Sequence, residues 1–142
     1  MSLDLTSLQK SISSLAISVD VYFQFEQNKK NEDTVNILDV LKLGVIHKFK
    51  VTYEQCWKFM KRWIEENDSP NIVDGVTRRE LFRIFAENKL TLDVETWMNF
   101  HKSRNLTSHT YDKKNAEESF NISVSFLKEA SNFLARIKSH ND

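Results

Sequence analysis

The first third of the chain carries apolar residues at spacings of three and four, which is the period of one face of an α-helix. A first helix of about six turns is predicted, and it gives way at the charged segment 28–33. Ile17, Val21 and Phe25 should widen its apolar face. The positions expected to face the core are Leu5, Leu8, Ile12, Leu15, Val19 and Tyr22.

The same period predicts a longer second helix that runs to the sequence ENDSPNIVDG at residues 66–75. This segment holds the single Pro and one of the two Gly, so it is predicted to be a loop. Within the helix, Gly44 and the β-branched pair Val51 and Thr52 are candidate positions for a bend. The expected inner positions are Leu38, Leu41, Val45, Phe49, Tyr53, Trp57, Met60 and Ile64.

Two shorter helices and one long helix are predicted in the second half of the chain. Thr77 is placed to cap a short third helix that ends near Asn88, and Glu80 completes the pattern of a capping box. A fourth helix begins near Asp93 and enters the polar segment that follows it. Asp112 is placed to cap the last helix. Its expected inner positions are Ala116, Phe120, Val124, Leu127, Leu134 and Ile137.

These patterns together predict an all-α fold. No stretch reads as a β-strand, and two Gly and one Pro leave little material for tight turns. Five amphipathic helices with short connections indicate an antiparallel up-and-down helical bundle of about five helices, in one domain over residues 1–142. An apolar face left over by this packing would be covered by a second copy of the chain.

The composition limits the function classes. Twenty basic residues balance twenty acidic ones, so net charge alone does not draw the chain to nucleic acid or to a membrane. No segment approaches the roughly 20 apolar residues of a membrane span, and the N-terminus lacks the pattern of a signal peptide, so a cytoplasmic location is expected. Cys56 lies in an apolar-periodic stretch, which favours a core thiol over a nucleophile.

The sequence lacks the usual spacing of metal ligands. Its four histidines lie too far apart, without cysteines or paired carboxylates at ligand spacing, to suggest a metal site. No metal and no cofactor are therefore expected.

The polar sequence RNLTSHTYD at residues 104–112 is the remaining candidate for chemistry. On a continuous helix Asn105 and His109 would share a face, and an extended Arg104 could reach them. A guanidinium fork suits phosphate oxygens, and a histidine can take the proton of a ribose 2′-OH, so the three suit metal-independent cleavage of an RNA phosphodiester. Capping and dipole compensation at a helix end select the same residue types, and the spacing leaves both readings open.

The sequence RNLTSHTYD resembles the R-x4-H-x-Y motif of the HEPN superfamily, with Asn105 as the polar residue after the arginine. The rest of the chain is similar to one branch, the nucleotidyltransferase substrate-binding protein family, also described as the HEPN toxin of MNT/HEPN toxin–antitoxin pairs. The resemblance covers roughly residues 5–137. The segments that carry it, from the second, third and fourth helices, are GVIHKFKVTYEQCWKFMKRWIEE, RRELFRIFAENKL and DVETWMNFHKSRN.

The resemblance implies a homodimeric ribonuclease toxin whose sites face each other across the dimer interface. Its catalytic residues would be Arg104, Asn105 and His109. The implied partner is a minimal nucleotidyltransferase antitoxin with its own ATP and Mg²⁺ site, which adds AMP to Tyr111. A nucleotide attached there would occupy the anion site of the arginine and exclude RNA.

Other functions remain open from the sequence. The chain could be a non-catalytic subunit that binds a substrate or a nucleotide for the transferase, or a scaffold dimer without a site. For RNA contact, Lys113 and Lys114 are the candidates beside the motif. A second candidate is the basic excess of residues 42–63, where Glu54 is the single acidic residue, although a solvated helix face explains it equally well.

Overall fold

The computed structural model describes residues 3–28, 31–90 and 92–141, with the backbone alone for 89 and 90. The helices are α1 (Thr6–Glu26), α2 (Glu32–Asn67), α3 (Arg78–Phe85), α4 (Val94–Asn105) and α5 (Lys113–Ser139). A π-helical segment, η1 (Ala86–Leu90), extends α3, and a 3-10 turn, η2 (Thr107–His109), follows α4. The described residues contain no β-strand, and the expected all-α bundle of about five helices is confirmed.

Four of the five helices begin at a side chain that accepts a hydrogen bond from the first turn. The capping residues are Asn31, Thr77, Asp93 and Asp112. The predicted caps at Thr77 and Asp112 are therefore confirmed. The reciprocal half of the capping box is not formed in the described structure, because the Glu80 carboxylate lies 3.6 Å from Nη1 of Arg83 instead.

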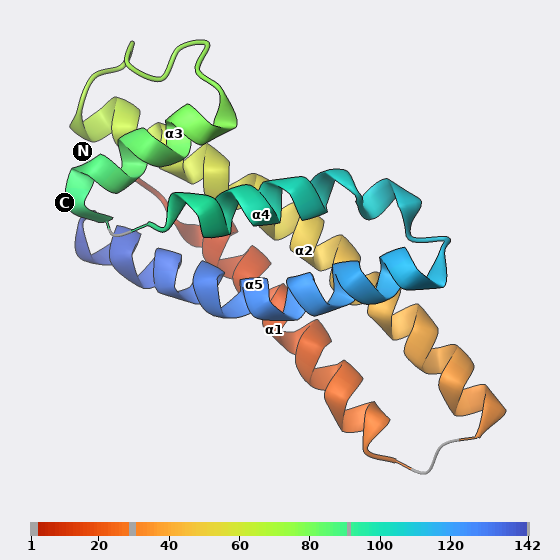
Figure 1. Cartoon of the computed structure of the whole chain (residues 1–142). Coiled ribbons are helices and arrows are strands. Elements are labelled where there is room, and N and C mark those ends of the chain that lie inside the picture. The colour runs from red at the N-terminus through yellow and green to blue at the C-terminus, as the bar shows by residue number, and fades with distance from the viewer. Residues whose placement is uncertain (1–2, 29–30, 91, 142) are drawn as a thin grey trace.

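Helix α2 is the centre of the bundle, since it contacts all four other helices. It forms a long antiparallel pair with α1, and α5 packs along both (Figure 1). The helix runs without interruption through Gly44 and through Val51 and Thr52, so the candidate bends do not break it. The two ends of the chain are tied together, because Leu3 and Asn141 exchange hydrogen bonds of 2.8 and 2.9 Å.

The prediction for the face of α1 was right for its inner stripe and for Phe25, which is partly buried against the core, and wrong for Ile17 and Val21. All six expected inner positions are buried. Ile17 and Val21, however, are 63% and 43% exposed. They lie off the stripe that faces α2 and α5, so the monomer leaves them in solvent.

The predicted inner stripe of α5 was partly wrong. Phe126 and Phe133 are buried, whereas the sequence pattern placed the next residues, Leu127 and Leu134, on the inner stripe. Ser123 and Ala130, which the predicted stripe did not include, also face inward and continue the period of the helix. The Ser123 hydroxyl donates to the Ser119 carbonyl at 2.7 Å, so its burial leaves no donor unsatisfied. Of the other predicted positions, Val124, Leu127 and Leu134 are partly buried against the core, and Ala116 is also partly buried. The buried positions are Ser119, Phe120, Ser123, Phe126, Ala130, Phe133 and Ile137.

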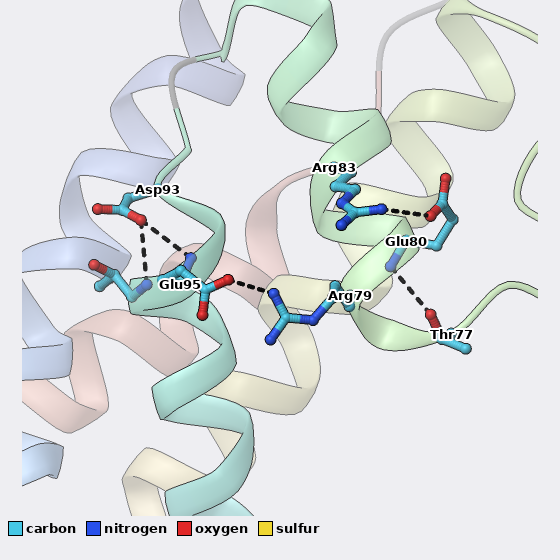
Figure 2. A network of polar contacts seen from close by, with 7 residues as sticks. Thr77, Arg79, Glu80, Arg83, Asp93 and Glu95 are labelled. Carbon is cyan, nitrogen blue, oxygen red and sulfur yellow. Dashed lines mark hydrogen bonds and ion pairs between the residues drawn. The ribbon is translucent and has the colours of Figure 1, made fainter.

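Charged side chains fasten the short helix α3 to α4. Arg79 on α3 forms an ion pair with Glu95 in the first turn of α4, while Asp93 caps that turn (Figure 2). The loop before α3 turns at Gly75, whose φ of 67° is a conformation that favours glycine. The start of α3 is thereby fixed beside α2 and α4, where the candidate site is found.

Candidate functional site

The motif residues lie in the connection between α4 and α5, at the end of the bundle away from the chain termini (Figure 1). Arg104 and Asn105 end α4, His109 ends η2, and Tyr111 precedes α5. The expectation of one α-helix through Asn105 and His109 was wrong, because α4 ends at Asn105. These two side chains do not share a helical face, and both are exposed.

Short-range hydrogen bonds explain why α4 ends there. The N–H of Leu106 donates to the Ser103 carbonyl and that of His109 to the Leu106 carbonyl, both at 3.1 Å, which is the tighter 3-10 pattern. The Thr107 hydroxyl donates to the Arg104 carbonyl at 2.7 Å. A side chain thus satisfies a carbonyl that the ending helix leaves without a partner, and the motif folds into a compact turn.

Arg104 is anchored to α2 through one of its three guanidinium nitrogens. Its Nε lies 2.7 Å from Oε1 of Glu54, and the two side chains are 28% and 30% exposed. Oε2 of Glu54 accepts a hydrogen bond from Nε1 of Trp57 at 2.9 Å. Within the described residues the two terminal nitrogens of Arg104 have no hydrogen-bond partner, so they are available to an anion as a planar fork.

These contacts keep the Glu54 carboxylate ionised. Burial acts to raise the pKa of Glu54, but hydrogen bonds from Trp57 and Arg104, with the charge of Arg104, hold the pKa below its ordinary value of 4.5. Arg104 is consequently held by charge as well as by hydrogen bonding at neutral pH.

His109 and Tyr111 are exposed near each other on the surface of the turn. Their ring centroids are 6.4 Å apart, and Tyr111 is 88% exposed. No hydrogen bond or ion pair joins His109 to Arg104 among the residues that the structure describes. The turn therefore presents an imidazole and a phenol to solvent. The arginine that precedes it is held by Glu54 through Nε.

The first turn of α5 continues this surface. Lys113 and Lys114 are both exposed, and this turn contains no acidic residue. Helix N-termini carry a partial positive charge, so the two ammonium groups add to a field that already favours anions. A groove of about 370 Å³ opens between α2 and α5 beside the turn. Its lining residues are Val35, Asp39, Lys42, Leu43, Thr110, Tyr111, Lys113, Ala116 and Glu117.

His101, one helical turn before Arg104 on α4, contacts the buried Tyr53 of α2. The Tyr53 hydroxyl is 2.8 Å from Nδ1 of His101. Burial raises the pKa of Tyr53 above its ordinary value, so its hydroxyl keeps the proton. Burial and the charge of Arg78 lower the pKa of His101. The neutral imidazole accordingly accepts at Nδ1 and carries its own proton on Nε2.

Cys56 is fully buried, which confirms the predicted core position. Burial raises the pKa of its thiol, so the side chain is not ionised at neutral pH. Within residues 3–28, 31–90 and 92–141, no three His, Cys, Asp or Glu side chains are placed to hold a metal ion. A search of the same residues found no helix with the length and apolar character of a membrane span.

Sequence reasoning missed Glu54 and His101 as partners in this site. The signal for Glu54 was its position as the single acidic residue in the basic run 42–63. His101 precedes Arg104 by three residues, which places both on one side of α4. The basic run itself is partly committed elsewhere, because Lys42 pairs with Glu117.

Comparisons with known proteins agree with this architecture. The family model described as nucleotidyltransferase substrate binding protein like matches residues 3–139. A relative from Haemophilus influenzae (strain Rd), described as probable ribonuclease HepT, is 32% identical over 107 residues, which are 74% of this chain and 73% of the relative.

Solved structures show the same fold. A Haemophilus influenzae structure, described as revealing the fold of a substrate-binding domain of a nucleotidyltransferase, superposes with a TM-score of 0.84 at 26% identity over 95% of this chain and 99% of that one. A crystal structure from Thermus thermophilus shares the fold at a TM-score of 0.67 and 20% identity, over 89% and 98% of the two chains. Since the family model also spans nearly the whole chain, this protein belongs to the nucleotidyltransferase substrate-binding protein family within the HEPN superfamily.

Proposed function

We propose that this protein is a metal-independent ribonuclease toxin of a two-gene toxin–antitoxin pair. The observation that carries the proposal is the anchoring of Arg104. Its Nε is fixed by Glu54, its terminal nitrogens have no partner among the described residues, and His109 lies five residues along in a compact exposed turn. The relative described as a probable ribonuclease supports the same reaction class.

The proposed reaction uses the RNA's own 2′-hydroxyl as the nucleophile. His109 accepts the proton of this hydroxyl, and the oxygen attacks the adjacent phosphorus. The bond from phosphorus to the 5′ oxygen of the next nucleotide breaks, that oxygen takes a proton from water, and a 2′,3′-cyclic phosphate remains. The imidazolium of His109 then returns its proton to solvent. Arg104 stabilises the charge on the phosphate oxygens, and Asn105 orients the substrate.

A second copy of the chain is proposed to complete the site. Several large apolar side chains on α1 and α2 are exposed in the monomer, with Ile17 and Val40 at 63% and 68%. Burial of such residues between two copies would be favourable and would bring two motif turns together. The site would then be a cleft with walls from both subunits.

The proposed regulation acts at Tyr111. The partner, a minimal nucleotidyltransferase, would transfer AMP from ATP to the Tyr111 hydroxyl and release pyrophosphate. The Tyr111 side chain is exposed, as such a modification requires. The added phosphate and nucleotide would compete with RNA for the arginine. Co-expression with the partner should yield protein carrying one or more AMP groups, detected by mass spectrometry, while Tyr111→Phe should remain unmodified. Modification of Tyr111→Phe to the same extent would place the reaction elsewhere.

The nuclease proposal is tested with purified protein and RNA in EDTA. Wild-type protein should leave cyclic phosphate ends, and His109→Ala and Arg104→Ala should each lower the rate by roughly 100-fold or more. His140→Ala is the matched control, because it removes an exposed histidine that follows α5, away from both the motif and the proposed dimer surface. Equal cleavage by wild-type protein and His109→Ala would identify a contaminating nuclease and contradict the proposal.

A second candidate is a non-catalytic subunit that binds a substrate or nucleotide for the transferase. The family description and the Haemophilus influenzae structure, both worded as substrate-binding, favour it. The unpartnered fork of Arg104 would then hold a phosphate without turnover. Nucleotide binding by calorimetry, together with no cleavage of RNA by wild-type protein, would select this function.

A further inference from the structure

Three arginines lie in the first two turns of α3, and two of them have carboxylate partners. Arg79 pairs with Glu95 across the gap to α4, and Arg83 lies 3.6 Å from the Glu80 carboxylate (Figure 2). The third, Arg78, forms no ion pair with the residues that the structure describes. A half-buried arginine without a carboxylate of its own is an unusual arrangement, because the charge loses hydration without compensation.

Arg78 lies against an aromatic ring instead of a carboxylate. Its guanidinium carbon lies 3.5 Å from the centroid of the Trp57 ring, which is the geometry of a cation–π contact. Its Nε is buried and has no hydrogen-bond partner among the described atoms. Burial and the charge of Arg104 lower the pKa of Arg78, opposed by Glu54 and by Tyr53, with which the guanidinium shares a hydrogen bond. The group stays charged at neutral pH, in a position set by Trp57 and Tyr53.

The same tryptophan connects Arg78 to the anchored arginine of the motif. Trp57 donates to Glu54, and Glu54 accepts from Nε of Arg104, so the two guanidinium groups flank one carboxylate and one indole. Both arginines also act electrostatically on His101, which is neutral. The charges of Arg78 and Arg104 are thus balanced only in part by the carboxylate of Glu54, and a bound anion would neutralise the remaining positive charge.

We propose that Arg78 is a second phosphate-binding residue of this site, which takes a backbone phosphate next to the scissile phosphate held by Arg104. The inference rests on the proposed ribonuclease function. A polyanionic strand suits this arrangement because its consecutive phosphates can engage two separate forks, whereas a single small anion can satisfy only one. Arg78 comes from α3 and Arg104 from α4, so the fold joins elements remote in sequence into one track for the RNA backbone.

The test measures binding of a single-stranded RNA with 2′-O-methyl riboses, which cannot be cleaved by 2′-OH attack, over a series of salt concentrations. Arg78→Gln should raise Kd about tenfold and reduce the slope of log K against log salt by about 0.7, the effect of one lost phosphate contact on a single strand. Arg79→Gln is the matched control, since it removes the same charge from the next residue, whose partner is Glu95. It should leave the salt slope unchanged.

Cleavage of ordinary RNA by the same preparations tests the ribonuclease function separately from the phosphate role of Arg78. If wild-type protein cleaves RNA and binds the analogue, but Arg78→Gln matches Arg79→Gln in Kd and slope, Arg78 has no phosphate role and the ribonuclease proposal stands. If wild-type protein neither cleaves nor binds, both proposals fail. Should Arg78→Gln not fold, Arg78→Lys decides: it keeps the charge and loses the fork, so a rise in Kd of about threefold supports the site and an unchanged Kd overturns it.

Discussion

The orientation of Arg104 is set by a carboxylate that is itself fixed on both oxygens. Glu54 accepts from Arg104 at 2.7 Å and from Trp57 at 2.9 Å, so it has little freedom to rotate. An arginine held in this way loses less conformational entropy when it binds a phosphate. In the proposed ribonuclease, Glu54 would therefore be a positioning residue, which acts on RNA only through the guanidinium.

Replacement of Glu54 by Gln should lower the free energy of unfolding at pH 7 by about 1–2 kcal/mol, because a charge-assisted hydrogen bond becomes a neutral one. The pKa of Glu54 is depressed in the folded state, so its contribution is full above the ordinary value of 4.5 and is lost as pH falls through the lower folded value. Urea unfolding should show a difference in the free energy of unfolding between wild-type protein and Glu54→Gln, and this difference should be smaller at pH 3 than at pH 7. Glu66→Gln, on the exposed side of α2, is the control. An equal difference in the free energy of unfolding at both pH values would contradict this account.

Helix α5 begins with an arrangement that couples its stability to the motif. Asp112 caps the helix through a 2.8 Å hydrogen bond from the N–H of Lys114, directly after the turn that holds His109 and Tyr111. Two lysines in a first turn are unfavourable with the helix dipole, so the Asp112 carboxylate is the group that offsets them.

Loss of this cap should destabilise both the helix and the turn before it. Asp112→Ala is expected to lower the free energy of unfolding by about 1 kcal/mol. Asp112→Asn keeps a capping oxygen, so it should retain more than half of the stability that the cap contributes. Thermal or urea unfolding measures the stability, and cleavage of RNA under native conditions reports on the turn. If Asp112→Ala is as stable as Asp112→Asn, the cap does not contribute.

The molecule as a whole leaves large apolar side chains exposed on the outer faces of α1 and α2. The inner faces of these helices are buried against each other and α5, while Ile17, Val21, Val40 and Leu43 remain between 43% and 68% exposed. Apolar exposure of this kind marks a surface for association, and the proposed ribonuclease needs two copies.

A charge placed on this surface should prevent association without disturbing the monomer. Val40→Glu is expected to shift sedimentation from dimer to monomer and to lower RNA cleavage in parallel, because an unpaired carboxylate would be buried between the copies. Lys138→Glu, at the exposed end of α5, changes the charge in the same direction away from this surface and should leave the oligomer intact. A Val40→Glu protein that remains a dimer would place the interface elsewhere.

The helices, the caps at Thr77 and Asp112, and the inner stripe of α1 were predictable from the sequence, because each depends on residues within one or two turns of the chain. The end of α4 at Asn105 was not, since the hydroxyl of Thr107 and a 3-10 turn prevail over a helical pattern that continues in the sequence. The stripe of α5 was predicted only in part, because Ser119 and Ser123 are buried on it and an apolar pattern gives no sign of a buried serine.

Sequence by itself determined that this chain is a helical bundle with a motif of Arg104, Asn105, His109 and Tyr111 between its last two helices. Only the tertiary structure decided what holds the arginine. Glu54 lies 50 residues away from Arg104, and Arg78 reaches Trp57 from another helix. No periodicity encodes such contacts, because they depend on how helices cross, and it is the crossing of α2, α3 and α4 that gathers two guanidinium groups around one carboxylate.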